Sequence, residues 1–536
     1  MGKKSKRQSG NSQPATKRST PATDAKVPLE EETKDNLRFE DPYVDELIEE
    51  EDVVDDGDDE MEDDEDEEVD MKVAASTLSG RKMNIVGDLG GDVELIQSWH
   101  PLMGHRGDGD EDLELEMDPS AYKMHQTLTP EWPSLSFDLL RDNLGDNRQR
   151  FPHSLQAVFG TQADTPGANQ LTVLKLSDLS KITQDRDDEE DILGDAYDKE
   201  DDGDESDSDE EEDIDLDPIL EHYSLPHYGG VNRVRAMPQN QNVVATWSDI
   251  GKVNLYDVKE LRDRFEASEG RSRFSGSSRP NTNGPFFSYS GHSTEGFAVD
   301  WSKVKKGSMA TGDNEGNIHL WSSHENGTSF TVTPSYETPG VSIEDLQWSP
   351  TEATVVCAAE SDGHVAIYDT RAPHRAMLRP HLHPNTDVNV LSWNKLVSNL
   401  LATGADDGTL CVWDLRNFSG DKTSEGPKPL ARFTCHQTPV TSVEWHPTDE
   451  SMLVISDEVG VYIYDLSVEE DIATQEKERQ QGRSKMEQLV ADIPPQLLFC
   501  HSGSKQFKEC HWHPQISSCV MTTAFSGFST FIPSNL

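Results

Sequence analysis

The stretch LATGADDGTLCVWDLR, residues 401–416, decides the fold of this chain. In its second half, Leu410 and Val412 are apolar and are separated by one position. Alternation with a period of two is the pattern of a β-strand that buries one face. Gly408 precedes this strand, at a place where a tight turn needs a residue that tolerates positive φ. The stretch therefore predicts two strands joined by a short hairpin.

The same 14-residue pattern occurs five times, in windows that begin at Val244, Met309, Val356, Leu401 and Met452. The thirteenth position of every window is aromatic: Tyr256, Trp321, Tyr368, Trp413 and Tyr464. A tryptophan stands 19 or 20 residues before four of these aromatics, and Trp512 stands 19 residues before Phe531, which adds a sixth copy. A weaker copy covers residues 153–176. Seven copies predict an all-β, seven-bladed β-propeller, in which repeated four-stranded units close into a ring.

Histidines and aspartates recur with this repeat, and the aspartates include Asp249, Asp362, Asp407 and Asp457. A catalytic group is needed once, whereas a residue that holds a turn is needed in every copy. We therefore expect structural roles and predict no enzyme activity, no catalytic residue and no cofactor. Cys510, His511 and His513 lie close together, but they lack the second half of a zinc site, so no metal site is predicted. The six cysteines form no CxxC pair, which is typical of a reduced, intracellular protein.

The chain carries 102 Asp+Glu against 47 Lys+Arg, which gives a formal net charge of −55. Residues 40–70 and residues 185–217 contain 21 acidic residues each. Such a protein repels nucleic acid and anionic lipid and attracts basic partners. We therefore expect no membrane contact and no specific nucleic-acid binding. High charge with few apolar residues also predicts that the acidic region 39–118 and the acidic insertion 183–217 are disordered.

Two segments carry signals for transport and modification. Residues 1–38 form a basic tail whose two clusters have the spacing of a bipartite nuclear import signal: Lys3, Lys4, Lys6, Arg7, Lys17 and Arg18. In the second acidic run, Ser206 and Ser208 each have an acidic residue at the third following position. Acid-directed kinases favour this context, so both serines are phosphorylation candidates, and a phosphate would add negative charge there.

The segment YKMHQTLTPEWPSLSFDLL, residues 122–140, precedes the first repeat. Apolar residues at every third or fourth position predict an amphipathic helix that ends in an extended strand at Trp-Pro. We expect residues 119–150 to form this helix and strand against the propeller, which would then cover residues 151–536. The segment resembles the N-terminal part of the histone-binding WD-repeat family, whose repeats have a Gly-His entrance and a Trp-Asp exit. The insertion 467–496, between the sixth and seventh blades, ends in PPQLLFCHSG and resembles that family's loop with paired prolines.

The acidic runs add a resemblance to the glutamate-rich WD-repeat subfamily of nucleolar ribosome-assembly factors. It implies a monomeric chaperone that captures a newly made basic protein, the third protein of the large ribosomal subunit, in the cytoplasm or nucleus. It also implies delivery to pre-ribosomal particles in the nucleolus. The resemblance places cargo in a groove between the helix and the proline loop, and position in the repeat adds two acids on the ring's rim. The candidate cargo-binding residues are Tyr122, Trp132, Glu295, Asp387, Glu469, Glu470, Asp471, Pro494 and Pro495.

Two other functions remain open from the sequence. A histone chaperone would share the fold and the charge argument, because histones are also strongly basic. A substrate receptor of a cullin-type ubiquitin ligase would use a Trp-Asp-x-Arg ending, which is present at residues 413–416 and in weaker form, with tyrosine, at residues 368–371.

Overall fold

The computed structural model describes residues 117–182, 218–268, 284–325, 327–338, 340–372, 374–418, 426–468 and 493–536. These residues form seven antiparallel sheets, which confirms the predicted seven-bladed β-propeller. The basic tail, nearly all of the acidic region 39–118, the acidic insertion 183–217 and most of the proline-loop insertion lie outside the described residues. None of the described helices is long and apolar enough to cross a membrane.

Blades one to three use the strands β2 (Phe137–Leu140), β3 (His153–Gly160), β4 (Gln170–Leu179), β5 (Ile219–Pro226), β6 (Val231–Met237), β7 (Asn240–Ser248), β8 (Lys252–Asp257), β9 (Phe287–Tyr289), β10 (Ala298–Trp301), β11 (Ser308–Gly312), β12 (Asn317–Ser323) and β13 (Phe330–Glu337). Blades four to six use β14 (Ile343–Trp348), β15 (Val355–Glu360), β16 (Val365–Asp369), β17 (Val388–Trp393), β18 (Leu400–Ala405), β19 (Leu410–Asp414), β20 (Ala431–Phe433), β21 (Val440–Trp445), β22 (Met452–Asp457), β23 (Val461–Asp465) and β24 (Leu497–His501). Short helices are η2 (Pro119–Ala121), η3 (Pro166–Ala168), α2 (Lys259–Ser268) and η5 (Leu415–Asn417).

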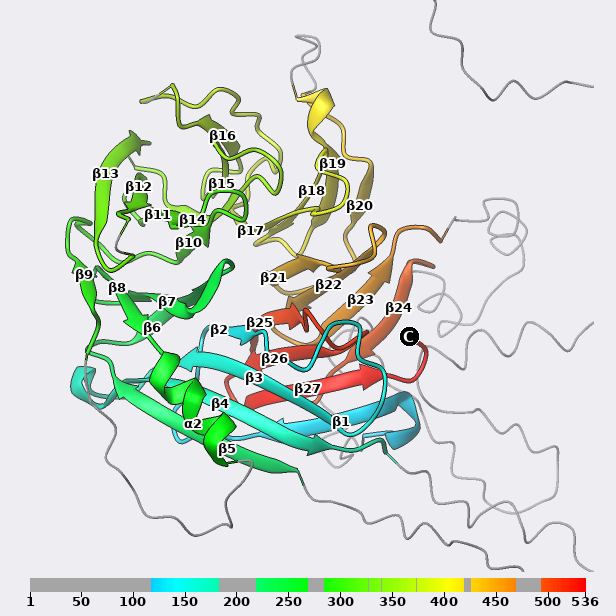
Figure 1. Cartoon of the computed structure of the whole chain (residues 1–536). Helices are drawn as coiled ribbons and strands as arrows, with labels where there is room; N and C mark the ends of the chain where they lie inside the picture. The colour runs from blue at the N-terminus through cyan, green and yellow to red at the C-terminus, as the bar shows by residue number, and fades with distance from the viewer. Residues whose placement is uncertain are drawn as a thin grey trace, which may run out of the picture. The chain divides into compact units, whose positions relative to one another are not determined.

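The seventh blade joins the two ends of the described chain. Its strands β25 (Phe507–Trp512), β26 (Val520–Ala524) and β27 (Gly527–Pro533) come from the C-terminal end, and its fourth strand is β1 (Tyr122–Leu128). β1 pairs antiparallel with β27, with His125 opposite Phe531, and Figure 1 shows the two strands side by side. The ring is therefore closed by a segment that precedes the first blade in the sequence.

The predicted helix at residues 122–128 is wrong, because these residues form β1. Tyr122 and Met124 are buried while Lys123 and His125 are only half-buried, so the true period is two. The free edge of β27 satisfies the backbone hydrogen bonds of this segment. A strand from the opposite end of the described chain thus decides a local ambiguity between helix and strand.

The predicted hairpins are confirmed in register. Leu401 lies opposite Trp413 and Gly404 lies opposite Leu410, so the quoted stretch forms β18 and β19. Gly408 has φ +77°, and an added Cβ there would lie 2.4 Å from the carbonyl oxygen of His436. This turn therefore requires glycine both for its backbone conformation and for the close approach of the next blade's link.

The repeated histidines and aspartates hold the blades together. In blade three, the His292 imidazole lies 2.7 Å from the Asp313 carboxylate and 2.9 Å from the Thr311 hydroxyl, which accepts a hydrogen bond from Trp321. His436 and Asp457 form the same pair in blade six. These buried groups satisfy one another, as expected for structural residues.

The two faces of the ring carry different connections. We call the face on which each innermost strand begins the top face. It carries the links between blades and the hairpins between second and third strands, and a hydrogen bond from the Asp406 backbone N–H to the Asp387 carbonyl joins one hairpin to one link. The bottom face carries the other connections. Residues 183–217 and 469–492 connect third to fourth strands, so the proline-loop insertion lies inside blade six and not after it.

Candidate protein-binding surface

The two predicted rim acids lie in equivalent links on the top face. Glu295 links blades two and three, is half-buried, and accepts a hydrogen bond of 3.0 Å from the Asn232 side chain. Asp387 links blades four and five and is exposed. Both residues are therefore held at the end of the ring where the innermost strands begin.

Asp387 belongs to a group of acids on this face. Partial burial raises its pKa, and the nearby carboxylates of Asp406 and Asp362 raise it further. Burial also raises the pKa of Glu344, and Asp387 adds to that increase. Like charges that raise one another's pKa are relieved by a cation, so this group is suited to a basic side chain.

A cavity of about 230 Å³ opens beside these acids at the mouth of the central channel. Its lining combines Glu344 with Arg233, Lys508 and neutral residues from the beginnings of several innermost strands. The top face also exposes three apolar side chains, at 66 % for Tyr228, 38 % for Ile250 and 62 % for Phe525. Apolar anchors beside acidic groups are typical of a surface that binds protein.

A buried ionic network lies below this mouth and was not predicted. Glu509 of β25 is 1 % exposed and contacts Arg233 at 2.8 Å and Arg235 at 2.6 Å. It also accepts a hydrogen bond of 2.9 Å from the backbone of Phe137. Burial alone would raise the pKa of Glu509, but Arg235, His511 and Arg233 hold it well below its usual value. The network joins blade seven to blades one and two, which is where the ring closes.

His511 completes the network as a cation. Its ring lies 3.0 Å from Glu444 and 3.5 Å from Glu509. Burial lowers its pKa, but Glu509 and Glu444 outweigh this effect and raise the pKa to about 9. The imidazole is therefore charged at neutral pH.

Stability should depend on the titration of His511. Because its folded pKa of about 9 exceeds the ordinary value of 6.5, its contribution is fully present below pH 6.5 and is lost as the pH rises through 9. We expect the free energy of unfolding to fall by about 2–3 kcal/mol across this window. Urea unfolding at several pH values measures this change. The slope should be absent from His511→Gln, and an equal slope in both proteins would contradict the assignment.

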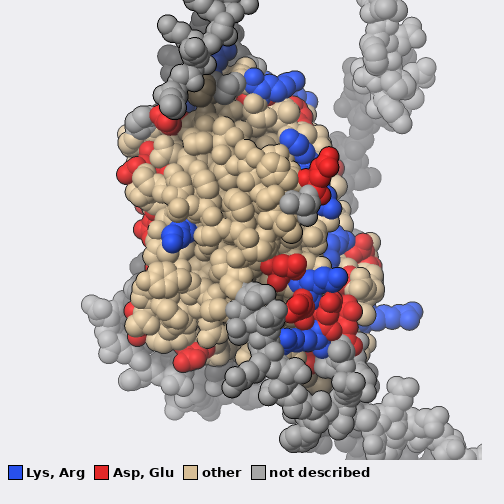
Figure 2. Space-filling view, turned by 60° about the vertical axis from the view of Figure 1, so that its left-hand side comes forward, with Lys and Arg blue, Asp and Glu red and all other residues tan. Residues whose placement is uncertain are grey.

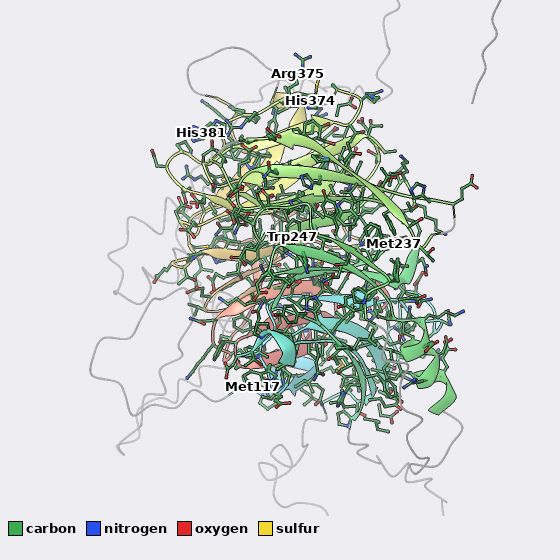
Figure 3. All side chains as sticks on the ribbon, turned by 90° about the vertical axis from the view of Figure 1, so that its left-hand side faces the viewer. Met117, Met237, Trp247, His374, Arg375 and His381 are labelled. Carbon is green, nitrogen blue, oxygen red and sulfur yellow. The ribbon has the colours of Figure 1, made fainter. Side chains whose placement is uncertain are left out.

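The predicted groove residues do not come together. The Tyr122 ring is buried, and its hydroxyl lies 2.8 Å from His501, so it is part of the core between blades six and seven. Trp132 is half-buried in the link on the top face, whereas Pro494 and Pro495 precede β24 on the bottom face. The acids of the proline-loop insertion lie outside the described residues: Glu469, Glu470 and Asp471. Figure 3 places Met117, the first of the described residues, away from His374, Arg375 and His381 of blade four.

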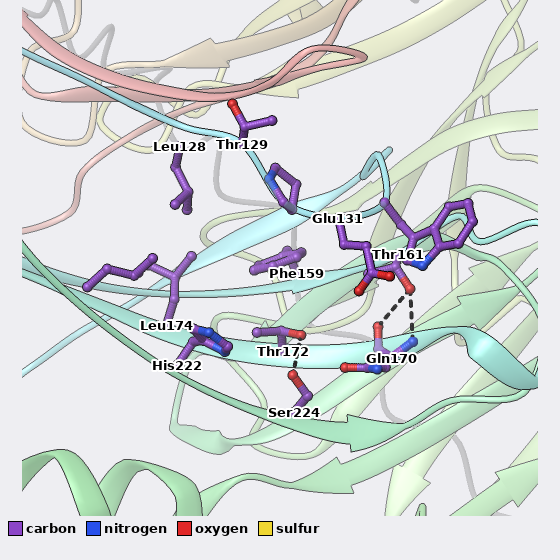
Figure 4. Close-up of a pocket in the computed structure, with 13 residues that line it drawn as sticks. Leu128, Thr129, Glu131, Phe159, Thr161, Gln170, Thr172, Leu174, His222 and Ser224 are labelled. Carbon is purple, nitrogen blue, oxygen red and sulfur yellow. Dashed lines mark hydrogen bonds between the residues drawn. The ribbon is translucent and has the colours of Figure 1, made fainter. Parts of the chain in front are cut away.

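The link that contains Trp132 forms one wall of a pocket of about 320 Å³ (Figure 4). The link runs from β1 to β2 and is held by hydrogen bonds at Pro133 and Ser134. β3, β4 and β5 form the other wall. The pocket is lined by Leu128, Thr129, Pro130, Glu131, Trp132, Phe159, Thr161, Gln170, Thr172, Leu174, Leu220, His222 and Ser224.

Comparison with known proteins decides the family. Residues 112–180 match the family model for the histone-binding protein RBBP4 and its counterpart in the CAF1 complex, and residues 376–414 and 427–457 match the WD domain, G-beta repeat. The chain is 34 % identical over 503 residues to ribosome assembly protein rrb1 of Schizosaccharomyces pombe, with 92 % of each protein covered. It is 35 % identical over 427 residues to glutamate-rich WD repeat-containing protein 1 of Dictyostelium discoideum, covering 80 % and 83 %. The chain belongs to the glutamate-rich WD-repeat family. It is also 38 % identical over 450 residues to protein HEAT STRESS TOLERANT DWD 1 of Arabidopsis thaliana, covering 82 % and 91 %.

The histone-binding family match covers β1 to β4 and so includes the closing strand and the pocket's link. The WD-repeat arginines are less distinctive. Arg416 is 71 % exposed and forms a two-point ion pair with Asp414 of its own Trp-Asp-x-Arg ending, and Arg371 pairs with Asp369 in the same way. Both guanidinium groups are thus occupied locally.

Other residue clusters in the described ranges are structural. Cys510 packs in the core between blades six and seven, His511 lies in the ionic network, and the His513 ring accepts backbone hydrogen bonds from Gln515 and Ile516. Glu360, Asp362 and His364 lie close enough to hold a cation, but Arg379 already contacts both carboxylates. Figure 2 shows a broad uncharged area on one side of the propeller, with charged side chains gathered toward its edges.

Proposed function

We propose that this protein is a ribosome-biogenesis factor that binds a basic protein of the large ribosomal subunit on its top face. The name of the Schizosaccharomyces pombe relative, ribosome assembly protein, supports the biological process. The observation that carries the binding mode is the group of acids at the channel mouth, where Asp387 and Glu344 have raised pKa values. The cargo we expect is the newly made third protein of the large subunit, delivered to pre-ribosomal particles in the nucleolus.

The charge of the chain supports a division of labour. The two acidic runs contribute 42 acidic residues, as the sum of 21 and 21, and they act at long range and without shape. The top face contributes fixed acids beside apolar anchors, which supply selectivity through complementary shape. Capture by the acidic runs would thus precede docking on the propeller. The protein acts as a binding chaperone and not as an enzyme in this proposal.

Purification of the tagged full chain from growing cells at low and high salt tests the proposal. We expect one large-subunit ribosomal protein to be recovered at both salt concentrations, because docking on a shaped surface resists screening better than contacts with the acidic runs. The double variant Glu344→Gln, Asp387→Asn should lose that protein at high salt. The matched control is Glu325→Gln, an exposed acid between the third and fourth strands of blade three. Recovery of histones with a chromatin-assembly factor would instead contradict the ribosomal cargo.

The histone chaperone is the second candidate, and the family match at residues 112–180 is the observation that favours it. The same purification separates the two functions because it identifies the bound proteins directly. The ubiquitin-ligase receptor has less support, since Arg416 is occupied by Asp414. The nuclear import signal and the phosphorylation of Ser206 and Ser208 remain proposals for residues outside the described ranges.

A further inference from the structure

The pocket between blades seven and one has an apolar base. Phe159 and Leu174 are 5 % and 0 % exposed, and the partly buried Leu128 packs in the same region. Three hydroxyl groups on its walls already have partners: Thr161 bonds Asn169 and Gln170, and Thr172 bonds Ser224 at 2.9 Å. The base and the walls are therefore complete and do not themselves require a polar ligand.

Glu131 is the exception among the lining residues. It is exposed, and none of the described residues forms a hydrogen bond or an ion pair with its carboxylate. Figure 4 shows this side chain extending from the link toward Phe159 and Thr161, over the hollow. The described lining contains no lysine or arginine, so the carboxylate is the one full charge there, apart from the titratable ring of His222.

Trp132 adds a second feature that favours a cation. Its indole also lines the pocket, next to Glu131 in the chain. The face of an indole attracts a cation, and arginine stacks on it while it donates paired hydrogen bonds to a carboxylate. Arginine also has an apolar stem, which would cover Phe159 and Leu174 while its charged end stays at the rim.

We propose that this pocket binds an arginine side chain of a protein partner, with the guanidinium group between Glu131 and Trp132. The inference rests on the proposed function and deepens it, because a basic cargo would supply the arginine. It adds a docking point about one blade away from the channel mouth on the same face, set between β1 and β3–β5. Two separated points would fix the direction in which a cargo segment crosses the face.

Fluorine NMR of the full chain labelled with 5-fluorotryptophan tests the pocket without cargo. The Trp132→Phe variant identifies the resonance of Trp132, and the probe is N-acetyl-arginine amide. We expect that resonance to shift and saturate, whereas the neutral citrulline analogue should leave it in place. Glu131→Gln should weaken probe binding about fivefold, which is the upper range for a partly exposed ion pair. N-acetyl-lysine amide carries the same charge as the probe, so it controls for nonspecific attraction to the acidic runs.

Two further variants make the test specific. Glu325→Gln removes the same charge from an exposed site in blade three and should leave probe affinity unchanged. Leu220→Trp fills the pocket from a position that is 42 % exposed and should abolish the shift without disturbing the core. The proposal is overturned if the resonance does not move, if citrulline moves it equally, or if the lysine analogue binds as tightly. These outcomes concern the pocket alone, because the proposed function is tested by the proteins recovered from cells.

Discussion

Replacing Glu509 with alanine should lower the free energy of unfolding by about 3–5 kcal/mol. The substitution leaves Arg233 and Arg235 without their buried partner and removes the acceptor for the Phe137 backbone N–H. Uncompensated buried charges are costly because the interior cannot solvate them as water does. Urea unfolding followed by circular dichroism measures the change.

The control for this prediction is Glu352→Ala, an exposed acid on the bottom face of blade four. Surface changes of this kind usually alter stability by less than about 0.5 kcal/mol. A loss below about 1 kcal/mol in Glu509→Ala would show that the network contributes little to ring closure. Such a result would also remove the basis for the pH dependence expected of His511.

Deleting residues 1–128 should destabilise the propeller by at least about 4 kcal/mol, while deleting residues 1–116 should leave its stability unchanged. The longer deletion removes β1, including the buried Tyr122 and Met124. It also leaves the edge of β27 unpaired, and an exposed edge strand pairs readily with other chains.

Urea midpoints and light scattering of the two truncated proteins measure these effects. The shorter deletion is the matched control, since it ends just before the described residues begin. Equal midpoints and equal scattering would mean that β1 is not needed to close the ring. We expect instead that the longer deletion both unfolds at lower urea and associates.

The repeat is legible in the sequence because its signals are local. Gly408, Leu410 and Trp413 lie within one hairpin, and each position reflects a turn or a buried face of that hairpin. The charge runs are equally direct, since they are composition. These features predicted the strands, the seven blades and a preference for basic partners.

Tertiary structure decided the rest. Tyr122 and Met124 fit a helix or a strand by local pattern, and only the free edge of β27 selects the strand. The arginine partners of Glu509 lie 276 and 274 residues away in the chain, so no local pattern contains them. The pocket at Glu131 exists because a link and three strands of another blade meet.

By itself, therefore, the sequence determined the repeating hairpins, the number of blades and the sign of the charge, because short-range periodicity and composition control these properties. The tertiary structure alone decided which strand closes the ring, which acids share the top face and which carboxylate at the pocket remains unpaired among the described residues. These depend on contacts between distant segments, and their energies appear only when the blades pack against one another.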